Sequence, residues 1–324
     1  MPTRRHVLGA LAAILGSSAG PVLAQPYPVR PVRIVVPLPP GSPPDVLARI
    51  VADKLQEAWK QPVVVENKPG ATGMIGLDLV AKSPPAGYTV GVMFLTHTVL
   101  PALFGKVPYN TTGDFAPIAN LVWLYNALVV PPSVPVHNVQ ELVALARAQP
   151  GKLTYGSGGN GSPAHLIGAS FCRGANVDLL HVPFKGPVEA VQALLGGHVS
   201  AMFATTSVAA PMVKAGRLRA LAVTSPTRLV ALPDVPTLAE SGITGFEMRE
   251  WEGVVAPAGT PQLIVEQWNR ELARVMALPD VRERIGELGM VPAAANTSDE
   301  FSGLVRSELQ HWTRFIKTSG IKVD

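Results

Sequence analysis

The sequence has only one cysteine, Cys172, so no disulfide can form within the chain. It also lacks the H-E-x-x-H and C-x-x-C patterns of zinc sites, the G-x-x-x-x-G-K-[ST] loop of nucleotide-binding proteins and the G-x-S-x-G elbow of serine hydrolases. These absences argue against the common metal, nucleotide and hydrolase sites. We therefore expect no cofactor and no metal, and we expect Cys172 to be a small core residue.

Long apolar runs are missing after the first two dozen residues, so no later segment is expected to span a membrane. The formal net charge is +4, but the basic residues are dispersed along the chain. This dispersion argues against a nucleic-acid-binding surface. Hydrophobic residues make up 47% of the sequence. That share is ample for two packed domains of ordinary size.

The first 24 residues have the features of an export signal. Arg4 and Arg5 form a charged start, residues 7–15 are apolar, and the small residues at 22–24 are typical of a cleavage site. The arginine pair resembles a twin-arginine signal, and a chance pair in an ordinary secretory signal is the alternative. We expect a mature chain that begins near Gln25, in the bacterial periplasm.

The segment 34–59 predicts a strand, a tight loop and a helix. The β-branched residues Ile34–Val36 are typical of a buried parallel strand, and the prolines and glycine of 37–44 prevent regular structure. After Asp45 the apolar residues recur at helical spacing. A helix N-terminus at the carboxyl edge of a sheet presents free N–H groups that can bind a carboxylate. An ordinary α/β turn is the alternative.

A second loop of this kind follows the predicted strand Leu153–Tyr155. Residues 156–161 are rich in glycine, which lets backbone N–H groups approach a ligand closely. Ser162 as N-cap with Pro163 at the first helical position predicts a helix start. Two anion-binding loops therefore favour a binding function more than either loop alone.

Strands and helices alternate throughout the chain, which predicts an α/β fold with mostly parallel sheets. Two linking segments, near 125–131 and 244–253, divide it into two lobes. We predict one lobe from 25–127 and 250–324, and a second, inserted lobe from 128–249.

Polar residues at two predicted strand ends have alternative interpretations. His97 follows the strand over 89–95, and is either a ligand contact or a satisfied histidine between the domains. Glu247, Glu250 and Glu252 flank Trp251. Paired acids can perform acid–base chemistry, but solvated or interlobe salt bridges need fewer assumptions.

Several motifs together resemble the Bug family, the substrate-binding receptors of bacterial tripartite tricarboxylate transporters. The resemblance covers nearly the whole mature chain in order. The motifs are Pro37-x-Pro39-Pro40-Gly41 with Asp45, Val65–Gly70, Gly87-Tyr88-Thr89, Tyr155–Ser162, His181–Gly186 and Ala256–Pro261. It implies a two-lobed periplasmic binding protein fold of type II, without enzymatic activity, that closes on a small carboxylated solute.

The resemblance and the strand ends together indicate the ligand-binding residues. In the family, the two glycine-bearing loops hold a carboxylate through backbone N–H groups, hydroxyls and ordered water. The predicted contacts are Pro40, Gly41, Ser42, Asp45, Thr72, Thr96, His97, Ser157, Gly158, Asn160, Ser162, His165, Lys185 and Thr205.

The sequence departs from the family pattern at two places. Pro44 removes an N–H donor from the first loop, where the family usually has small residues, and the Ser42 hydroxyl is a candidate substitute. Family members that resemble amino-acid binders carry an acid at the position of Ala204. We therefore predict an organic acid without an amino group.

The expected partners follow from the same resemblance. A monomeric receptor would deliver its solute to membrane transporter subunits, and a sensor that partners a membrane kinase is the main alternative. A periplasmic hydrolase is a remote third reading, because the sequence shows no nucleophile with a base beside it.

Overall fold

The computed structural model describes residues 27–243 and 249–319. The predicted signal segment 1–24 lies outside the described residues. The elements in chain order are β1 (Val32–Val36), α1 (Pro43–Trp59), β2 (Val63–Asn67), the 3₁₀ turn Ala71–Gly73, α2 (Met74–Ala81), β3 (Thr89–Phe94), α3 (Thr96–Phe104), β4 (Phe115–Leu124), β5 (Asn126–Val130), α4 (Val139–Ala148), β6 (Thr154–Ser157), α5 (Pro163–Ala175), β7 (Leu180–Pro183), α6 (Pro187–Leu195), β8 (Ala201–Thr205), α7 (Thr206–Lys214), β9 (Arg219–Val223), β10 (Glu250–Pro257), α8 (Gln262–Ala277), α9 (Pro279–Glu287), β11 (Met290–Pro292) and α10 (Ser298–Ser319).

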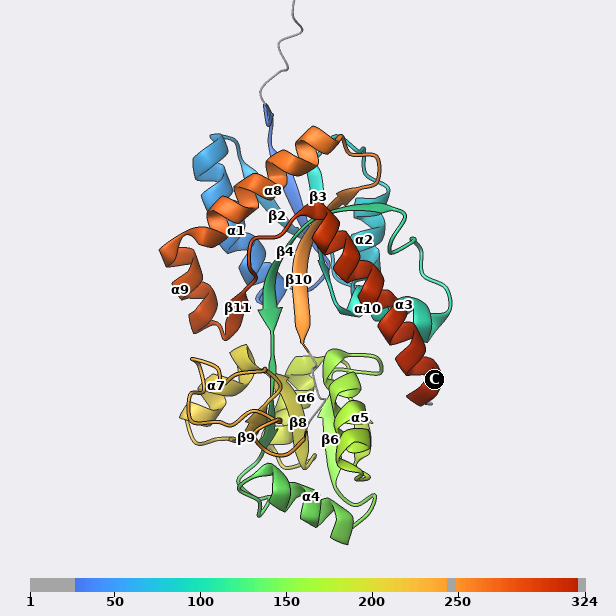
Figure 1. The fold of residues 1–324 in the computed structure, drawn as a ribbon, viewed down its shortest axis with the longest axis vertical. Coiled ribbons are helices and arrows are strands. Elements are labelled where there is room, and N and C mark those ends of the chain that lie inside the picture. The colour runs from blue at the N-terminus through green and yellow to red at the C-terminus, as the bar shows by residue number, and fades with distance from the viewer. Residues whose placement is uncertain (1–26, 244–248, 320–324) are drawn as a thin grey trace, which may run out of the picture.

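These elements form two sheets, each flanked by helices, one above the other in Figure 1. The six-stranded sheet has the order β11-β4-β10-β3-β1-β2, and the five-stranded sheet has the order β7-β6-β8-β5-β9. This arrangement confirms the predicted α/β class with two lobes. No helix in the described ranges combines the length and the apolarity that a bilayer crossing requires.

The sheets are mixed, so the prediction of mostly parallel sheets is wrong. The pairs β1–β2, β1–β3, β6–β7 and β6–β8 are parallel, as βαβ units require. However, β10 is antiparallel to both β3 and β4, and β5 is antiparallel to both β8 and β9. The chain enters the five-stranded sheet through β5 and returns through β10, and each of these strands runs against its neighbours.

The run 118–130, which includes the predicted linking segment near 125–131, forms two strands that belong to different sheets. β4 ends at Leu124, β5 begins at Asn126, and Tyr125 lies between them. Thr206 N–H donates a hydrogen bond to the Tyr125 carbonyl oxygen at 2.9 Å, which fixes the start of α7 against this crossing point. The crossing is therefore tied to the five-stranded sheet by backbone as well as side-chain contacts.

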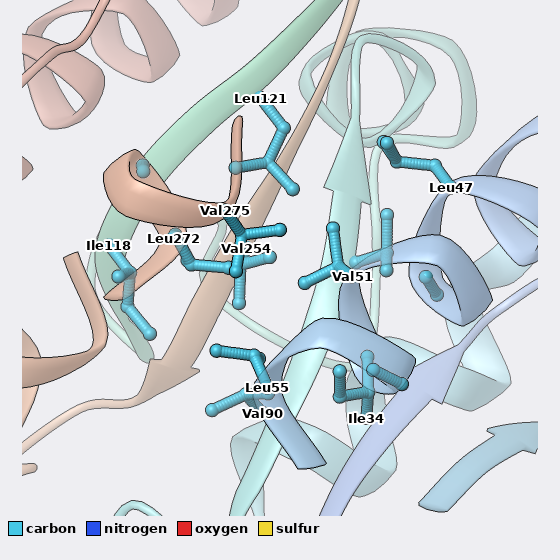
Figure 2. Close-up of a cluster of buried hydrophobic side chains, with 14 of the residues drawn as sticks. Ile34, Leu47, Val51, Leu55, Val90, Ile118, Leu121, Val254, Leu272 and Val275 are labelled. Carbon is cyan, nitrogen blue, oxygen red and sulfur yellow. The ribbon is translucent and has the colours of Figure 1, made fainter. Parts of the chain in front are cut away.

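A continuous apolar core supports the edge of the six-stranded sheet where its parallel strands end. Residues of α1 and α8 pack on one face of the sheet, as Figure 2 shows for Leu47, Val51 and Leu272. The opposite face is covered by α2, α3 and α10, with Trp251 fully buried against Phe301. The loops at the sheet edge are thus held on a rigid base.

Candidate functional site

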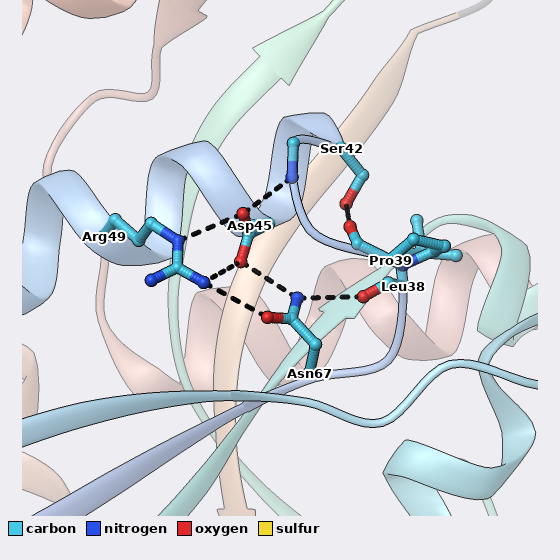
Figure 3. Close-up of polar contacts among 7 residues, drawn as sticks. Leu38, Pro39, Ser42, Asp45, Arg49 and Asn67 are labelled. Carbon is cyan, nitrogen blue, oxygen red and sulfur yellow. Dashed lines mark hydrogen bonds and ion pairs between the residues drawn. The ribbon is translucent and has the colours of Figure 1, made fainter. Parts of the chain in front are cut away.

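The loop between β1 and α1 is folded onto the first turn of the helix. Gly41 has a φ of 79°, a left-handed conformation that glycine adopts without strain. Its N–H group donates to Asp45 Oδ2 at 2.8 Å (Figure 3). The Ser42 hydroxyl donates to the Pro39 carbonyl oxygen at 2.7 Å. Both donors therefore shape the loop in this structure, while the exposed Pro40 lies at its tip.

Asp45 fixes the conformation of this loop through its carboxylate. Its side chain is 2% exposed, and besides Gly41 its carboxylate accepts hydrogen bonds from Arg49 and Asn67. Burial opposes ionisation, but the bonds from Arg49, Gly41 and Asn67 outweigh it and lower the pKa of Asp45. The carboxylate is committed to the loop, which suits a positioning residue better than a direct ligand contact.

The loops after β2 and β3 lie beside the first loop. Asn67 Nδ2 donates to the Leu38 carbonyl oxygen at 3.0 Å. A Cβ atom built on Gly73 would lie 2.7 Å from His97 Nε2, and one on Gly76 would lie 2.7 Å from Pro37 Cβ. The structure therefore brings three strand-end loops together at one edge of the six-stranded sheet.

Two predicted contacts in these loops differ in exposure. Thr72 is exposed and has a φ of 55°, within a turn whose left-handed residues run from Gly70 to Gly73. His97, in the first turn of α3 beside the buried Thr96, is fully buried. Its Nδ1 accepts a hydrogen bond from Phe94 N–H at 3.1 Å, and burial lowers its pKa to about 3. Its Nε2 atom, however, is buried without a hydrogen-bond partner, so His97 is neutral but not satisfied and stays a predicted ligand contact.

In the five-stranded sheet, the loop after β6 is built around the hydroxyl of Ser157. Its Oγ lies 2.7 Å from His181 Nε2 and also accepts a hydrogen bond from Gly159 N–H. Gly158 fits against the start of α6, because a Cβ there would lie 2.9 Å from Pro187 N. The loops after β6 and β7 are therefore adjacent.

His165 and His181 stack on each other under this loop, with ring centroids 3.8 Å apart. The Nδ1 atom of His165 accepts a hydrogen bond from Gly161 N–H at 3.0 Å, which ties α5 to the loop. Burial lowers the pKa of both histidines to about 4, and their mutual repulsion adds to the effect for His181. Both rings are neutral at physiological pH.

We expect stacked His165 and His181 to remove stability as pH decreases from about 6.5 to 4, because the unfolded chain binds protons that the buried rings do not. The loss should reach roughly 1–3 kcal/mol near pH 4.5. The raised pKa values of Glu250 and Glu252 act in the opposite direction, so the histidine contribution is measured as a difference between variants. Urea unfolding at several pH values checks this. Between pH 6.5 and 4.5, His181→Gln should lose less stability than wild type, whereas the same change at the exposed His198 should match wild type.

Ser162 directly precedes α5, and its side chain carries an unpaired hydroxyl group. It occupies the N-cap position, with Pro163 as the first helical residue, as predicted. However, its hydroxyl makes no capping bond. Its Oγ atom is buried and has no hydrogen-bond partner. Buried hydroxyls are usually paired, so this one indicates a partner that the chain itself does not provide.

The remaining predicted contacts are more dispersed. Asn160 is half-buried in the same loop. Lys185 is exposed, and its backbone N–H donates to Glu189 Oε2. Thr205 is half-buried at the start of α7 and pairs in register with Asn126. Of the predicted contacts, Lys185 therefore has the least structural support for a place in the binding site.

The loops of the two sheets approach each other at α3. A Cβ atom built on Gly161 would lie 2.0 Å from Leu103 Cδ1. Leu166 of α5 belongs to the apolar cluster that includes Val99 of α3 and Val35 of β1. These contacts place the Ser162 end of α5 against the same half of the six-stranded sheet that carries His97.

Sequence reasoning missed three residues that shape the site. His181 belongs to the motif His181–Gly186 but is not among the predicted contacts, although it is the partner of Ser157. Asn67 supports Asp45, and Leu103 meets Gly161. The motif Val65–Gly70 contains Asn67 and could have indicated that this residue supports the site. Leu103 gave no signal, because its role depends on how the two sheets face each other.

The structure contains a serine–histidine pair, so the expectation of no nucleophile beside a base needs correction. Ser157, however, is fully buried and already bonds to Gly159. Burial lowers the pKa of His181, which makes it a weak base. This pair therefore lacks the accessibility of a catalytic nucleophile.

The expected salt bridges of the β10 acids are also not observed. In the described residues, neither Glu250 nor Glu252 takes part in an ion pair, and Glu250 instead accepts a hydrogen bond from Asn126. Glu247 lies outside the described residues. Within the described ranges, no group of three or more His, Cys, Asp or Glu residues could hold a metal ion.

A hollow of about 270 Å³ lies at the opposite end of the six-stranded sheet, near the start of β1 and β3. Arg33 lines it and pairs with Glu66, and Arg30 stacks on Tyr88 at 3.9 Å. Both arginines of this hollow already interact with residues of the chain. None of the predicted ligand contacts lines the hollow.

Comparison with known proteins shows one consistent relationship. A family model described as "Tripartite tricarboxylate transporter family receptor" matches residues 47–321. The chain is 35% identical to Protein BugT of Bordetella pertussis over 98% of this chain and 97% of that protein.

Two solved structures from Rhodopseudomonas palustris are similar in both sequence and fold. One is Rpa4515 with adipate, at 32% identity and a TM-score of 0.85, covering 92% of this chain and all of that one. The other is MatC with bound malate, at 32% identity and a TM-score of 0.79, covering 90% of this chain and all of that one.

Proposed function

The chain belongs to the tripartite tricarboxylate transporter receptor family, and from this premise we propose that it binds an organic acid without an amino group and delivers it to a membrane transporter. Members of this family are periplasmic solute-binding receptors rather than enzymes. Adipate and malate in the two Rhodopseudomonas proteins support a carboxylate ligand. Export through the signal at 1–24 is part of the proposal.

The observation that carries this proposal is the unpaired hydroxyl of Ser162 at the N-terminus of α5. The first turn of a helix has free N–H groups and the positive end of the helix dipole, so an anion is favoured there. The β1–α1 loop precedes a second helix start, but Pro43 and Pro44 have no N–H and the Asp45 N–H bonds to the Ser42 carbonyl oxygen, so α1 contributes its dipole rather than free donors. A carboxylate between two helix starts would stabilise a closed arrangement of the lobes.

The proposed lobes are 25–127 with 250–324, and 128–249. Each contains one of the two sheets, and the first boundary falls within β5, the strand through which the chain enters the second sheet. Closure about β5 and β10 would bring α5 and α1 toward a common ligand. Ala204 is a buried apolar residue at the end of β8, which supports a ligand without an ammonium group there.

A thermal-shift screen of carboxylic acids tests the binding function, because a ligand that binds only the folded state raises the melting temperature. We expect at least one non-amino organic acid to raise it and to bind in calorimetry. If aspartate or glutamate binds more tightly than every non-amino acid, the ligand class is wrong. Uptake of the identified acid by cells with and without this protein tests delivery.

We expect Ser162→Ala to weaken binding of that acid by roughly 1–3 kcal/mol, because the substitution removes a hydrogen bond to a charged group. Ser170→Ala, two turns further along α5, is the matched control and should leave affinity unchanged. Isothermal titration calorimetry measures both variants. Equal affinity of wild type and Ser162→Ala would remove Ser162 from the site.

A further inference from the structure

Glu250 and Glu252 lie side by side where the chain re-enters the six-stranded sheet. They are the first and third residues of β10, so their side chains project from the same face. Glu250 Oε1 accepts a hydrogen bond from Nδ2 of Asn126, the first residue of β5, at 2.7 Å. This bond connects the two strands through which the chain crosses between the sheets.

Glu252 is left without a partner for one of its carboxyl oxygens. The residue is 4% exposed, and its Oε2 atom is buried with no hydrogen bond. Leaving a buried polar group unsatisfied costs free energy, and native structures rarely tolerate it without a reason. The free oxygen is therefore a candidate for contact with a molecule from outside the chain.

This carboxyl lies between predicted ligand contacts of both sheets. Glu252 pairs in register with Phe94, the last residue of β3, and the Phe94 ring contacts His97 at 4.1 Å. On the other side, Asn126 pairs in register with Thr205. Directly paired residues of antiparallel strands have neighbouring side chains. Glu250 and Glu252 therefore lie between the strand ends that carry Thr96 and Thr205.

The charge state of the pair restricts what it can bind. Burial raises the pKa of Glu250 to about 7, and it raises the pKa of Glu252 well above the ordinary value, with the nearby Glu250 charge adding to the effect. In the described residues no ion pair neutralises either acid. A carboxyl that keeps its proton offers a neutral donor and acceptor, which suits a hydroxyl group.

We propose that Glu252, positioned by Glu250 and Asn126, binds a hydroxyl group of the ligand and makes this receptor select hydroxy acids over the parent acids. The inference rests on the proposed function, because it concerns the same carboxylate ligand. The Ser162 end of α5 would hold the carboxylate, and the acid pair would recognise the carbon that carries the hydroxyl. A site that buries a polar group discriminates strongly against a ligand that leaves it unpaired.

The test uses three matched sets of ligands: succinate, glutarate and adipate, each as the parent acid and as its 2-hydroxy and 2-amino derivative. Calorimetry with the full mature chain should show at least one parent acid that binds. Its 2-hydroxy derivative should bind roughly tenfold or more tightly, and its 2-amino derivative more weakly than the hydroxy acid.

Variants then assign the preference to Glu252. Glu252→Leu should bring the affinity ratio of hydroxy acid to parent acid close to one while the parent acid binds within about threefold of wild type. Glu252→Gln keeps a carbonyl acceptor, so it should retain part of the preference. Glu283→Leu, at an exposed position of α9, is the matched control and should retain the wild-type ratio. Melting temperatures verify that each variant is folded.

The outcomes separate this inference from the proposed function. If a parent acid binds but its hydroxy derivative binds no better, the role of Glu252 is overturned and the receptor function stands. The same holds if Glu252→Leu and Glu252→Gln both keep the wild-type ratio. If the amino derivative binds most tightly, both the role of Glu252 and the proposed ligand class are overturned. If the screen finds no carboxylate that binds at all, the proposed function itself fails.

Discussion

Asp45→Ala is expected to reduce ligand affinity by roughly 100-fold and to lower the free energy of unfolding by about 2–4 kcal/mol. The substitution at this 2% exposed residue leaves the Gly41 N–H without its acceptor and removes one of the two hydrogen bonds that the Asn67 amide donates. The β1–α1 loop then loses the bonds that fix its conformation. Calorimetry measures the affinity, and urea unfolding measures the stability.

Asp280→Ala is a matched control for this experiment. Asp280 also lies in the first turn of a helix that starts with proline, and it pairs with Lys54 at 2.7 Å, but its side chain is 61% exposed. An exposed ion pair contributes little, so we expect a loss below about 1 kcal/mol and unchanged affinity. An Asp45→Ala protein that binds within threefold of wild type would contradict the positioning role of Asp45.

Gly161→Ala is expected to reduce affinity by about tenfold or more through a different mechanism. Its Cβ would lie 2.0 Å from Leu103 Cδ1, so the Leu103 side chain must move or the loop carrying Ser162 must lie farther from α3 than it does here. If ligand binding requires that approach, the closed state is penalised directly. Calorimetry gives the affinity, and small-angle scattering with and without ligand reports whether the lobes still close.

Two further variants separate the steric effect from backbone strain, since Gly161 has a φ of 76°. Gly216→Ala is the control for strain: its φ is 68° and no atom lies within 4 Å of the added Cβ. It should cost about 1 kcal/mol of stability without changing affinity. Leu103→Ala should recover part of the affinity lost in Gly161→Ala. If it recovers none, contact with Leu103 is not the cause.

Several local features were predictable from short segments. The β1–loop–α1 unit follows from β-branched residues, a proline-rich turn and helical spacing after Asp45. Asn138 caps α4 as expected, because its side chain accepts a hydrogen bond from Glu141 N–H at 2.8 Å. Such features depend on residues within one turn of each other, so propensity and capping chemistry determine them.

Other features could not be predicted in this way. The run 118–130 is rich in apolar residues, and its two asparagines, Asn120 and Asn126, do not distinguish a break at Tyr125 from a continuous strand. Strand direction was also mistaken for β5 and β10, because the alternation of strands and helices does not show which strands cross between sheets. The roles of Leu103, His181 and Glu252 depend on such long-range pairing.

By itself, the sequence determined that the chain is an α/β protein with glycine-bearing loops before helix starts, since turn chemistry and periodicity act over a few residues. Only the tertiary structure decided that Asp45 is committed to its own loop, that His97 is buried and neutral, and that the Ser162 hydroxyl and Glu252 Oε2 lack partners. The physical reason is that burial and hydrogen-bond satisfaction depend on neighbours distant in the chain, which residue order alone does not specify.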